Sequence, residues 1–234
     1  MIVGSIKEDL TLEKRVSITP ETAKNIIGLG LKVCVEKNYA SHLGIKDNDY
    51  KDVGVDIKSS SKEVLQSSNL IVKVNCPSEN EISTLKENTI LIGMLNLSKN
   101  KNQIGKMINK KIKVFSLELL PRITRAQSMD VLSSQSNLAG YRAVVDSVAE
   151  FEKAVPMMMT AAGTVPAAKV LIIGAGVAGL QAVATAKRLG AQVFAFDVRP
   201  VVKEQVESLG AKFVEVETDN ADDGVGDGGY AKET

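Results

Sequence analysis

Three glycines follow an apolar run and open a helical pattern, and together they could hold the pyrophosphate of a dinucleotide. Gly174 permits a tight turn after a strand, Gly176 lets the backbone approach a phosphate, and Gly179 lets the helix pack closely on the strand. A helix N-terminus also offers free N–H groups and a favourable dipole to an anion. The predicted contacts on this turn are Gly174, Gly176, Val177, Ala178 and Gly179.

A carboxylate follows the glycines at the distance expected of a ribose-binding acid. The next apolar run, residues 192–196, ends on Asp197, about 20 residues after the last glycine. A carboxylate accepts hydrogen bonds from ribose hydroxyls and repels a 2′-phosphate, so Asp197 favours NAD(H) over NADP(H). Arg199 is a residue that an NADP site would use, but at this spacing it could instead pair with Asp197. Val198 and Arg199 complete the predicted nucleotide contacts.

The composition excludes several classes of function. At 234 residues and 44% hydrophobic content the chain can bury a sizeable core in one or two domains. A net charge of +1 and 4% aromatic residues argue against a nucleic-acid partner. No apolar run approaches the roughly 18 residues of a spanning helix and the start has no signal-peptide pattern, so we expect a cytoplasmic protein. Cys34 and Cys76 lack a metal or redox spacing, so we predict no metal site.

Short β-like runs alternate with helical patterns, which is typical of a parallel α/β sheet. The predicted strands of the first half cover residues 2–6, 32–36, 70–74, 90–94 and 113–116, and the last third adds strands at 169–173, 192–196 and 212–216. The predicted helices lie between these strands, and the helix after Thr19 begins at Pro20, a residue favoured at the first helical position.

A long helical pattern without proline divides the chain. It predicts an α/β fold of two Rossmann-like domains with parallel sheets joined by a long helix: an N-terminal domain over 1–126, the helix over 127–155, and an NAD-binding domain over 156–234. The second domain shows about three strands of the usual six, so we expect it to be incomplete. The run 157–159, three methionines, is predicted to fill the core. The acidic, glycine-rich residues 218–230 are predicted to form a mobile loop.

Several separate stretches of the sequence point to one known family. KE at residues 7–8 and EKRVSITPE at 13–21 resemble an N-terminal signature that is shared by two branches of that family, the alanine dehydrogenases and the alpha subunit of proton-translocating NAD(P) transhydrogenase. LLPRITRAQSMD at 119–130 and SSQSNLAGY at 133–141 resemble the transhydrogenase branch, and the glycine turn, Asp197-Val198-Arg199 and GGYAKE at 228–233 continue that resemblance.

The resemblance implies a chain that binds NAD(H) and passes a hydride to NADP(H) on a partner subunit, coupled to proton movement through membrane subunits. It implies a homodimer, held through its partners on the cytoplasmic face of a bacterial inner membrane. It places four residues near the dihydronicotinamide, Arg122, Gln127, Asp130 and Ser133, and puts Tyr230 on a loop that closes over the nucleotide.

The residues fit this chemistry on their own terms. Hydride transfer between two nicotinamides releases no proton, so the site needs no general base. Gln127 has the donor and acceptor that suit a carboxamide. Arg122 and Asp130 could form an ion pair, or Asp130 could simply favour the start of a helix.

Two alternatives remain open. An alanine dehydrogenase uses an arginine, a lysine and a histidine, and Arg15 and Lys73 match the first two. Asn96 stands where that branch has its histidine, and an amide cannot act as a general acid or base. The other alternative is an NAD-binding module that performs no hydride exchange.

Overall fold

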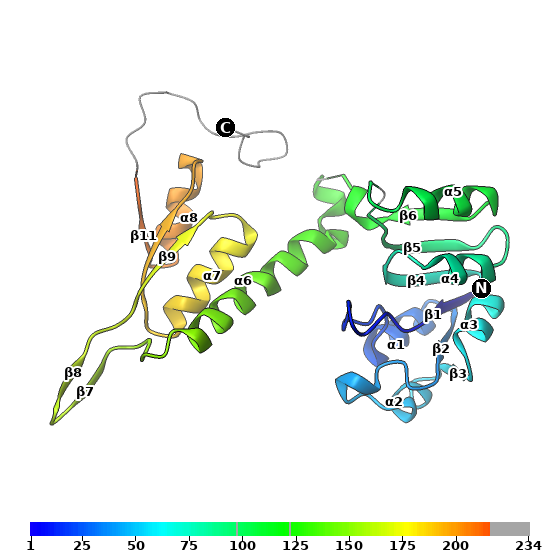
Figure 1. Ribbon diagram of the computed structural model, residues 1–234, viewed down its shortest axis with the longest axis horizontal. Helices are drawn as coiled ribbons and strands as arrows, with labels where there is room; N and C mark the ends of the chain where they lie inside the picture. The colour runs from blue at the N-terminus through cyan, green and yellow to red at the C-terminus, as the bar shows by residue number, and fades with distance from the viewer. Residues whose placement is uncertain (97, 122, 216–234) are drawn as a thin grey trace. The chain divides into compact units, whose positions relative to one another are not determined.

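The chain forms two compact units, residues 1–129 and 130–234, in a computed structural model that describes residues 1–96, 98–121 and 123–215 (Figure 1). The predicted mobile loop at 218–230 and its Tyr230 lie outside the described residues, as does Arg122. Among the described residues, no helix has the length and apolar character needed to cross a membrane.

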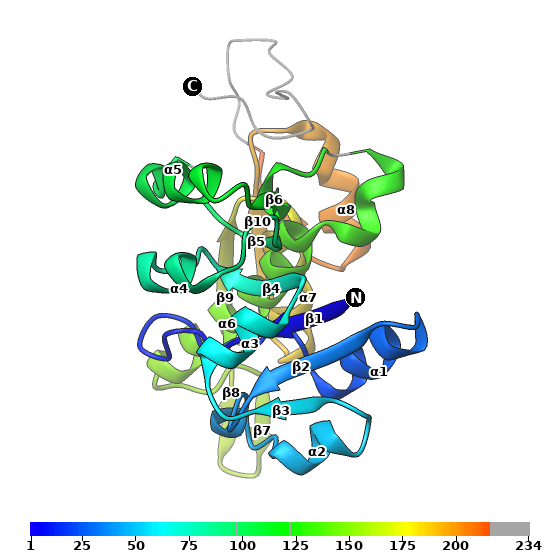
Figure 2. The ribbon, with the colours of Figure 1, turned by 90° about the vertical axis from the view of Figure 1, so that its right-hand side faces the viewer.

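The first unit is a doubly wound parallel sheet (Figure 2). Its described strands are β1 (Ile2–Ser5), β2 (Lys32–Glu36), β3 (Asp56–Lys58), β4 (Leu70–Asn75), β5 (Ile90–Met94) and β6 (Lys113–Ser116). They pair in the order β3-β2-β1-β4-β5-β6, all parallel, and the order reverses between β1 and β4. A reversal of this kind opens a crevice at the carboxyl ends of the two strands.

Helices cover both faces of this sheet. The described helices of this unit are α1 (Pro20–Gly28), η1 (Ser41–Leu43), α2 (Asp47–Lys51), α3 (Ser61–Ser67), α4 (Glu79–Thr84), α5 (Lys101–Asn109), η2 (Leu117–Leu119) and η3 (Thr124–Met129). Local caps explain where two of them begin: the Thr19 hydroxyl accepts from the Thr22 N–H at 3.2 Å, and Ser78 and Glu81 form a capping box. Two apolar cores, one on each face, hold the layers together.

The second unit begins with the long helix α6 (Val131–Glu150) and continues with the hairpin β7 (Met158–Thr160) and β8 (Gly163–Val165). The chain then forms β9 (Lys169–Ile173), α7 (Val177–Arg188), β10 (Gln192–Phe196), η4 (Pro200–Val202), α8 (Lys203–Ser208) and β11 (Lys212–Phe213). Within the described residues β9, β10 and β11 form a parallel sheet in the order β11-β10-β9. The α/β prediction is confirmed.

Helices α6 and α7 pack closely because α6 has a glycine at their contact. A Cβ placed on Gly140 would lie 2.0 Å from the carbonyl oxygen of Ala178. The helix predicted over 127–155 is α-helical only over Val131–Glu150, since η3 precedes it and Phe151 ends it. Along α6, Gly140 and Val144 are buried, whereas Leu138 and Tyr141 are more than half exposed. The i, i+3, i+4 spacing of its apolar residues, which include Leu138, Tyr141 and Val144, predicts that all of them are packed; this is wrong for Leu138 and Tyr141.

The three consecutive methionines are a second correction. The sequence predicts Met157, Met158 and Met159 in the core, but their exposed fractions are 60%, 50% and 72%. Met158 and Met159 belong to the first strand of the β7–β8 hairpin, and both strands of that hairpin have only exposed residues. A run of methionines predicts an apolar environment, but the sequence does not show which other residues would pack against these side chains.

Candidate functional site

The strand–turn–helix from β9 to α7 has the geometry that its glycines predict. Gly174 has a φ of +94°, a conformation that other residues rarely adopt, and its N–H donates to the Phe196 carbonyl oxygen at 2.8 Å. A Cβ on Gly179 would lie 1.7 Å from the Gly174 carbonyl oxygen, so only glycine permits this packing of helix on turn. These contacts fix the turn at the carboxyl ends of β9 and β10.

The first turn of α7 can receive an anion. Gly176 is the N-cap residue and has no side chain to satisfy the first N–H groups of the helix. Gly176 and Val177 are exposed and Ala178 is half-buried, so backbone donors face accessible space. With the helix dipole, these donors favour a phosphate.

Asp197 lies at the end of β10, beside the turn, and is held from two sides. Its Oδ2 accepts from the Ala175 N–H at 2.7 Å, and its Oδ1 accepts from the Arg199 N–H at 2.8 Å. The Arg199 guanidinium makes a two-pronged ion pair, Nε to Oδ1 and Nη2 to Oδ2, both at 2.9 Å. The predicted possibility that Arg199 pairs with Asp197 is confirmed.

These donors determine the ionisation of Asp197. Burial of the carboxyl would raise its pKa, but the Arg199 guanidinium and the N–H groups of Ala175 and Arg199 outweigh that effect and lower the pKa to about 2. Asp197 is therefore a buried anion at neutral pH. Val198, the other predicted contact in this segment, is 44% exposed.

Asp130 and Ser133 meet at the start of α6. The Ser133 N–H donates to Asp130 Oδ1 at 3.0 Å and the Ser133 hydroxyl donates to Asp130 Oδ2 at 2.6 Å, so Asp130 caps the helix. At the other end of α6, the Ala168 N–H donates to the Val155 carbonyl oxygen at 2.9 Å, which ties the chain just after the helix to the beginning of β9. Near its middle, at Gly140, α6 passes Ala178 in the first turn of α7, the helix that follows the glycine turn.

Gln127, predicted for the nicotinamide, is an exposed residue of η3 in the first unit. The structure thus brings Asp130 and Ser133 into contact and groups the turn with Asp197 and Arg199. Arg122 and Tyr230 lie outside the described residues.

A buried ion cluster lies where the first sheet reverses its strand order, and sequence reasoning missed it. Lys73 Nζ is 3.5 Å from a Glu8 oxygen and 3.0 Å from a Glu81 oxygen, and the side chains of Lys73 and Glu8 are both 4% exposed. Burial raises the pKa of Glu8, despite the opposing effects of Lys73 and of the Val74 N–H, which donates to Glu8 Oε1 at 2.7 Å. Sequence reasoning matches Lys73 to a site and includes Glu8 in a motif, but it does not pair them, because they lie far apart in the chain, after β1 and in β4.

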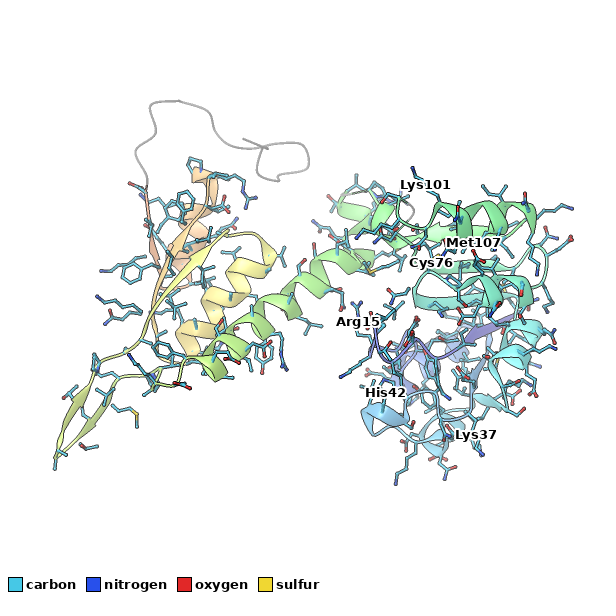
Figure 3. The ribbon with its side chains drawn as sticks, in the orientation of Figure 1. Arg15, Lys37, His42, Cys76, Lys101 and Met107 are labelled. Carbon is cyan, nitrogen blue, oxygen red and sulfur yellow. The ribbon has the colours of Figure 1, made fainter. Side chains whose placement is uncertain are left out.

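The other two positions compared with a dehydrogenase site, Arg15 and Asn96, also interact with neighbouring residues. Arg15 (Figure 3) forms an ion pair with Glu13, with 2.6 Å between Nη2 and Oε2. Asn96 has a φ of +48°, and its N–H donates to a Glu118 carboxylate oxygen at 2.6 Å. Glu118 also accepts from the Ser116 hydroxyl and thus fixes the loop after β5.

Comparison with known proteins gives consistent matches. The alanine dehydrogenase/PNT N-terminal domain matches residues 4–139 and the corresponding C-terminal domain matches residues 143–224. An NAD(P) transhydrogenase subunit alpha of Rhodospirillum rubrum is 48% identical over 100% of this chain and 62% of its own length. Alanine dehydrogenase of Methanococcus maripaludis is 31% identical over 85% of this chain and 53% of its own.

Solved structures of the same two kinds of protein also resemble this chain. Transhydrogenase from Sinorhizobium meliloti superposes with a TM-score of 0.88 at 48% identity, covering 92% of this chain and 64% of that one. An L-alanine dehydrogenase gives a TM-score of 0.78 at 25% identity, covering 91% and 60%. The chain spans about three fifths of the length of the Rhodospirillum rubrum relative.

Proposed function

Because the chain belongs to the alanine dehydrogenase/PNT family, we propose that it is the NAD(H)-binding component of a proton-translocating transhydrogenase. It would transfer a hydride between NAD(H) and NADP(H) held on a partner subunit. The observation that carries this proposal is the strand–turn–helix of β9 and α7 with the buried anion Asp197 beside it. Neither the NADP(H) site nor the proton path is assigned to this chain.

Each predicted site residue would have its own role in holding NAD(H). The N–H groups at Gly176 and Val177 would face the pyrophosphate, and Asp197 would accept from the adenosine ribose hydroxyls. Asp130 and Ser133, joined at the start of α6, and Gln127 of η3 would orient the nicotinamide, together with Arg122. Bound NAD(H) supplies the hydride, and no residue has to take up a proton because none is released. Catalysis would then rest on orientation.

The partners follow from the same proposal. The chain would act with membrane-bound and NADP(H)-binding subunits, as a homodimer, on the cytoplasmic face of the bacterial inner membrane. Tyr230 would close over the bound nucleotide. The names of the Rhodospirillum rubrum and Haemophilus influenzae relatives, both of which contain "subunit alpha", support a multi-subunit assembly.

The contacts of the first unit weigh against an alanine dehydrogenase reaction. A substrate carboxylate needs an available cation, but Lys73 is already held by Glu8 and Glu81, and Arg15 is paired with Glu13. Asn96 supplies no titratable group in place of a histidine.

A three-arm assay tests the proposed function. The chain is mixed with NADH and an NADP⁺-loaded partner subunit, with NADH, pyruvate and ammonium, or with NADH alone, and nucleotide oxidation is followed. We expect oxidation only with the partner subunit. Oxidation with pyruvate and ammonium would favour the dehydrogenase, and NADH binding without oxidation in any arm would favour a silent module.

The variant Gln127→Asn tests the role proposed for Gln127 in hydride transfer. Shortening the side chain by one methylene keeps the amide but moves it, so hydride transfer should slow about tenfold or more while NADH affinity changes little. Rates equal to those of the wild type would remove Gln127 from the site.

A further inference from the structure

The Asp197 carboxylate is fully occupied before any nucleotide binds. Each of its oxygens accepts two hydrogen bonds: Oδ1 from the N–H and Nε of Arg199, and Oδ2 from the Ala175 N–H and Arg199 Nη2. A carboxylate offers about four acceptor positions, so these donors fill it. A ribose that uses Asp197 must displace at least one of them.

Among these donors, the guanidinium is the group that can move. The Ala175 N–H belongs to the glycine turn, where Ala175 is 1% exposed, and the Arg199 N–H belongs to the backbone that follows β10. The Arg199 guanidinium belongs to a side chain that is 14% exposed, so of these donors it is the one that a change of rotamer can move without moving the backbone. Displacement of the guanidinium frees one position on each carboxylate oxygen, which matches two hydroxyls of a ribose.

The displaced guanidinium would stay close to the nucleotide. Arg199 Nη2 is 4.0 Å from the position that a Cβ on Gly176 would take, so the cation already lies beside the phosphate-binding turn. A 2′-phosphate on the ribose would meet two opposite influences, repulsion by Asp197 and attraction by the neighbouring Arg199.

We propose that Arg199 sets the nucleotide selectivity of this site by offsetting the Asp197 charge, so that 2′-phosphorylated dinucleotides are excluded less strongly than Asp197 alone would exclude them. The inference rests on the proposed NAD(H) site and concerns a specificity-determining residue within it. Removal of the cation should therefore sharpen the preference for NADH over NADPH.

The test is the ratio of the NADPH and NADH dissociation constants, measured by titration of each nucleotide into the 234-residue chain. Arg199→Gln should raise this ratio about five- to tenfold, mainly by weakening NADPH binding. Arg199→Lys keeps the positive charge but not the two-pronged guanidinium, and its ratio should stay within about twofold of the wild-type ratio. Arg142→Gln is the matched control, since it makes the same substitution in an exposed ion pair of the same unit, with Asp146; its ratio should not change.

An unchanged or lower ratio in Arg199→Gln would overturn the inference, as would an Arg199→Lys variant that behaves like Arg199→Gln. Failure of the proposed NAD(H) site looks different, because then the wild type itself binds neither nucleotide. Failure of the transhydrogenase reaction alone appears in the three-arm assay and leaves this ratio measurable. Adenosine fragments provide a second measurement: 2′,5′-ADP should lose more affinity than 5′-AMP in Arg199→Gln, and equal losses would contradict the proposal.

Discussion

At the scale of single residues, Asp197 joins the glycine turn to the expected ribose position. Its carboxylate accepts a hydrogen bond from the Ala175 N–H and pairs with the Arg199 guanidinium, so it orders the turn even without nucleotide. Two of its properties can therefore be tested separately, its recognition of ribose and its contribution to the stability of the second unit.

Asp197→Ala should weaken NADH binding about tenfold or more, because hydrogen bonds to a charged acceptor are lost. The same change removes repulsion of a 2′-phosphate and leaves Arg199 to attract it, so NADPH should lose less affinity than NADH or gain some. Titration of both nucleotides measures the effect. Unchanged selectivity would contradict the role given to Asp197.

Acid should destabilise the second unit through the same carboxylate. The folded pKa of Asp197 is about 2, below an unfolded value of about 3.9, so its contribution is complete above pH 4 and is lost as the pH falls toward 2. The shift corresponds to about 2 kcal/mol. Urea unfolding at pH 5 and pH 2.5 should show this loss in the wild type and a smaller loss in Asp197→Asn; equal losses would rule out this source.

At the scale of elements, the close contact at Gly140 and Ala178 holds α6 against α7, the helix that follows the glycine turn. Gly140→Ala would place a methyl group 2.0 Å from the Ala178 carbonyl oxygen, which belongs to the backbone and cannot easily yield. We expect a loss of about 3 kcal/mol in the free energy of unfolding of the second unit, measured by urea denaturation, with weaker NADH binding.

Gly105→Ala in α5 is the control, because a Cβ there meets nothing within 4 Å. An alanine in an open helical position should stabilise its unit by about 0.5–1 kcal/mol. If Gly140→Ala behaved like Gly105→Ala, the two helices would not be held together by this contact.

The same elements show how far sequence reasoning reaches. The strands at residues 32–36, 90–94 and 113–116 have the bounds that the sequence predicts, because continuous apolar runs end at residues that favour turns. β3 is a three-residue edge strand, and β7 and β8 form an exposed hairpin; sequence reasoning misses both because neither has a distinctive apolar pattern.

For the candidate site too, sequence reasoning reaches the features that depend on neighbouring residues and misses those that depend on the pairing of distant strands. The glycine roles depend on local sterics, and Arg199 lies two residues from Asp197, so sequence spacing is informative for both. The burial of Lys73 between Glu8 and Glu81 depends on the pairing of β1 with β4, which spacing alone cannot show. The predicted transhydrogenase and alanine dehydrogenase resemblance is confirmed by the family and structure matches.

At the scale of the whole molecule, NADH should stabilise the two units unequally. A ligand that binds only the folded site adds about 2.7 kcal/mol at a concentration 100 times its dissociation constant. Hydrogen exchange should therefore slow around the Gly174–Gly179 turn and in β10, while β1 and β2 of the first unit keep their rates. Equal protection of both sheets, or none, would place the binding elsewhere.

The most direct measurement follows the transferred hydride itself. The chain is supplied with NADH that carries deuterium at the transferable position and with NADP⁺ on the partner subunit, in ordinary water, and the NADPH formed is analysed by mass spectrometry. We expect each NADPH to contain the deuterium, because direct transfer between nicotinamides exchanges nothing with solvent. NADPH without deuterium, or no NADPH at all, would contradict the account.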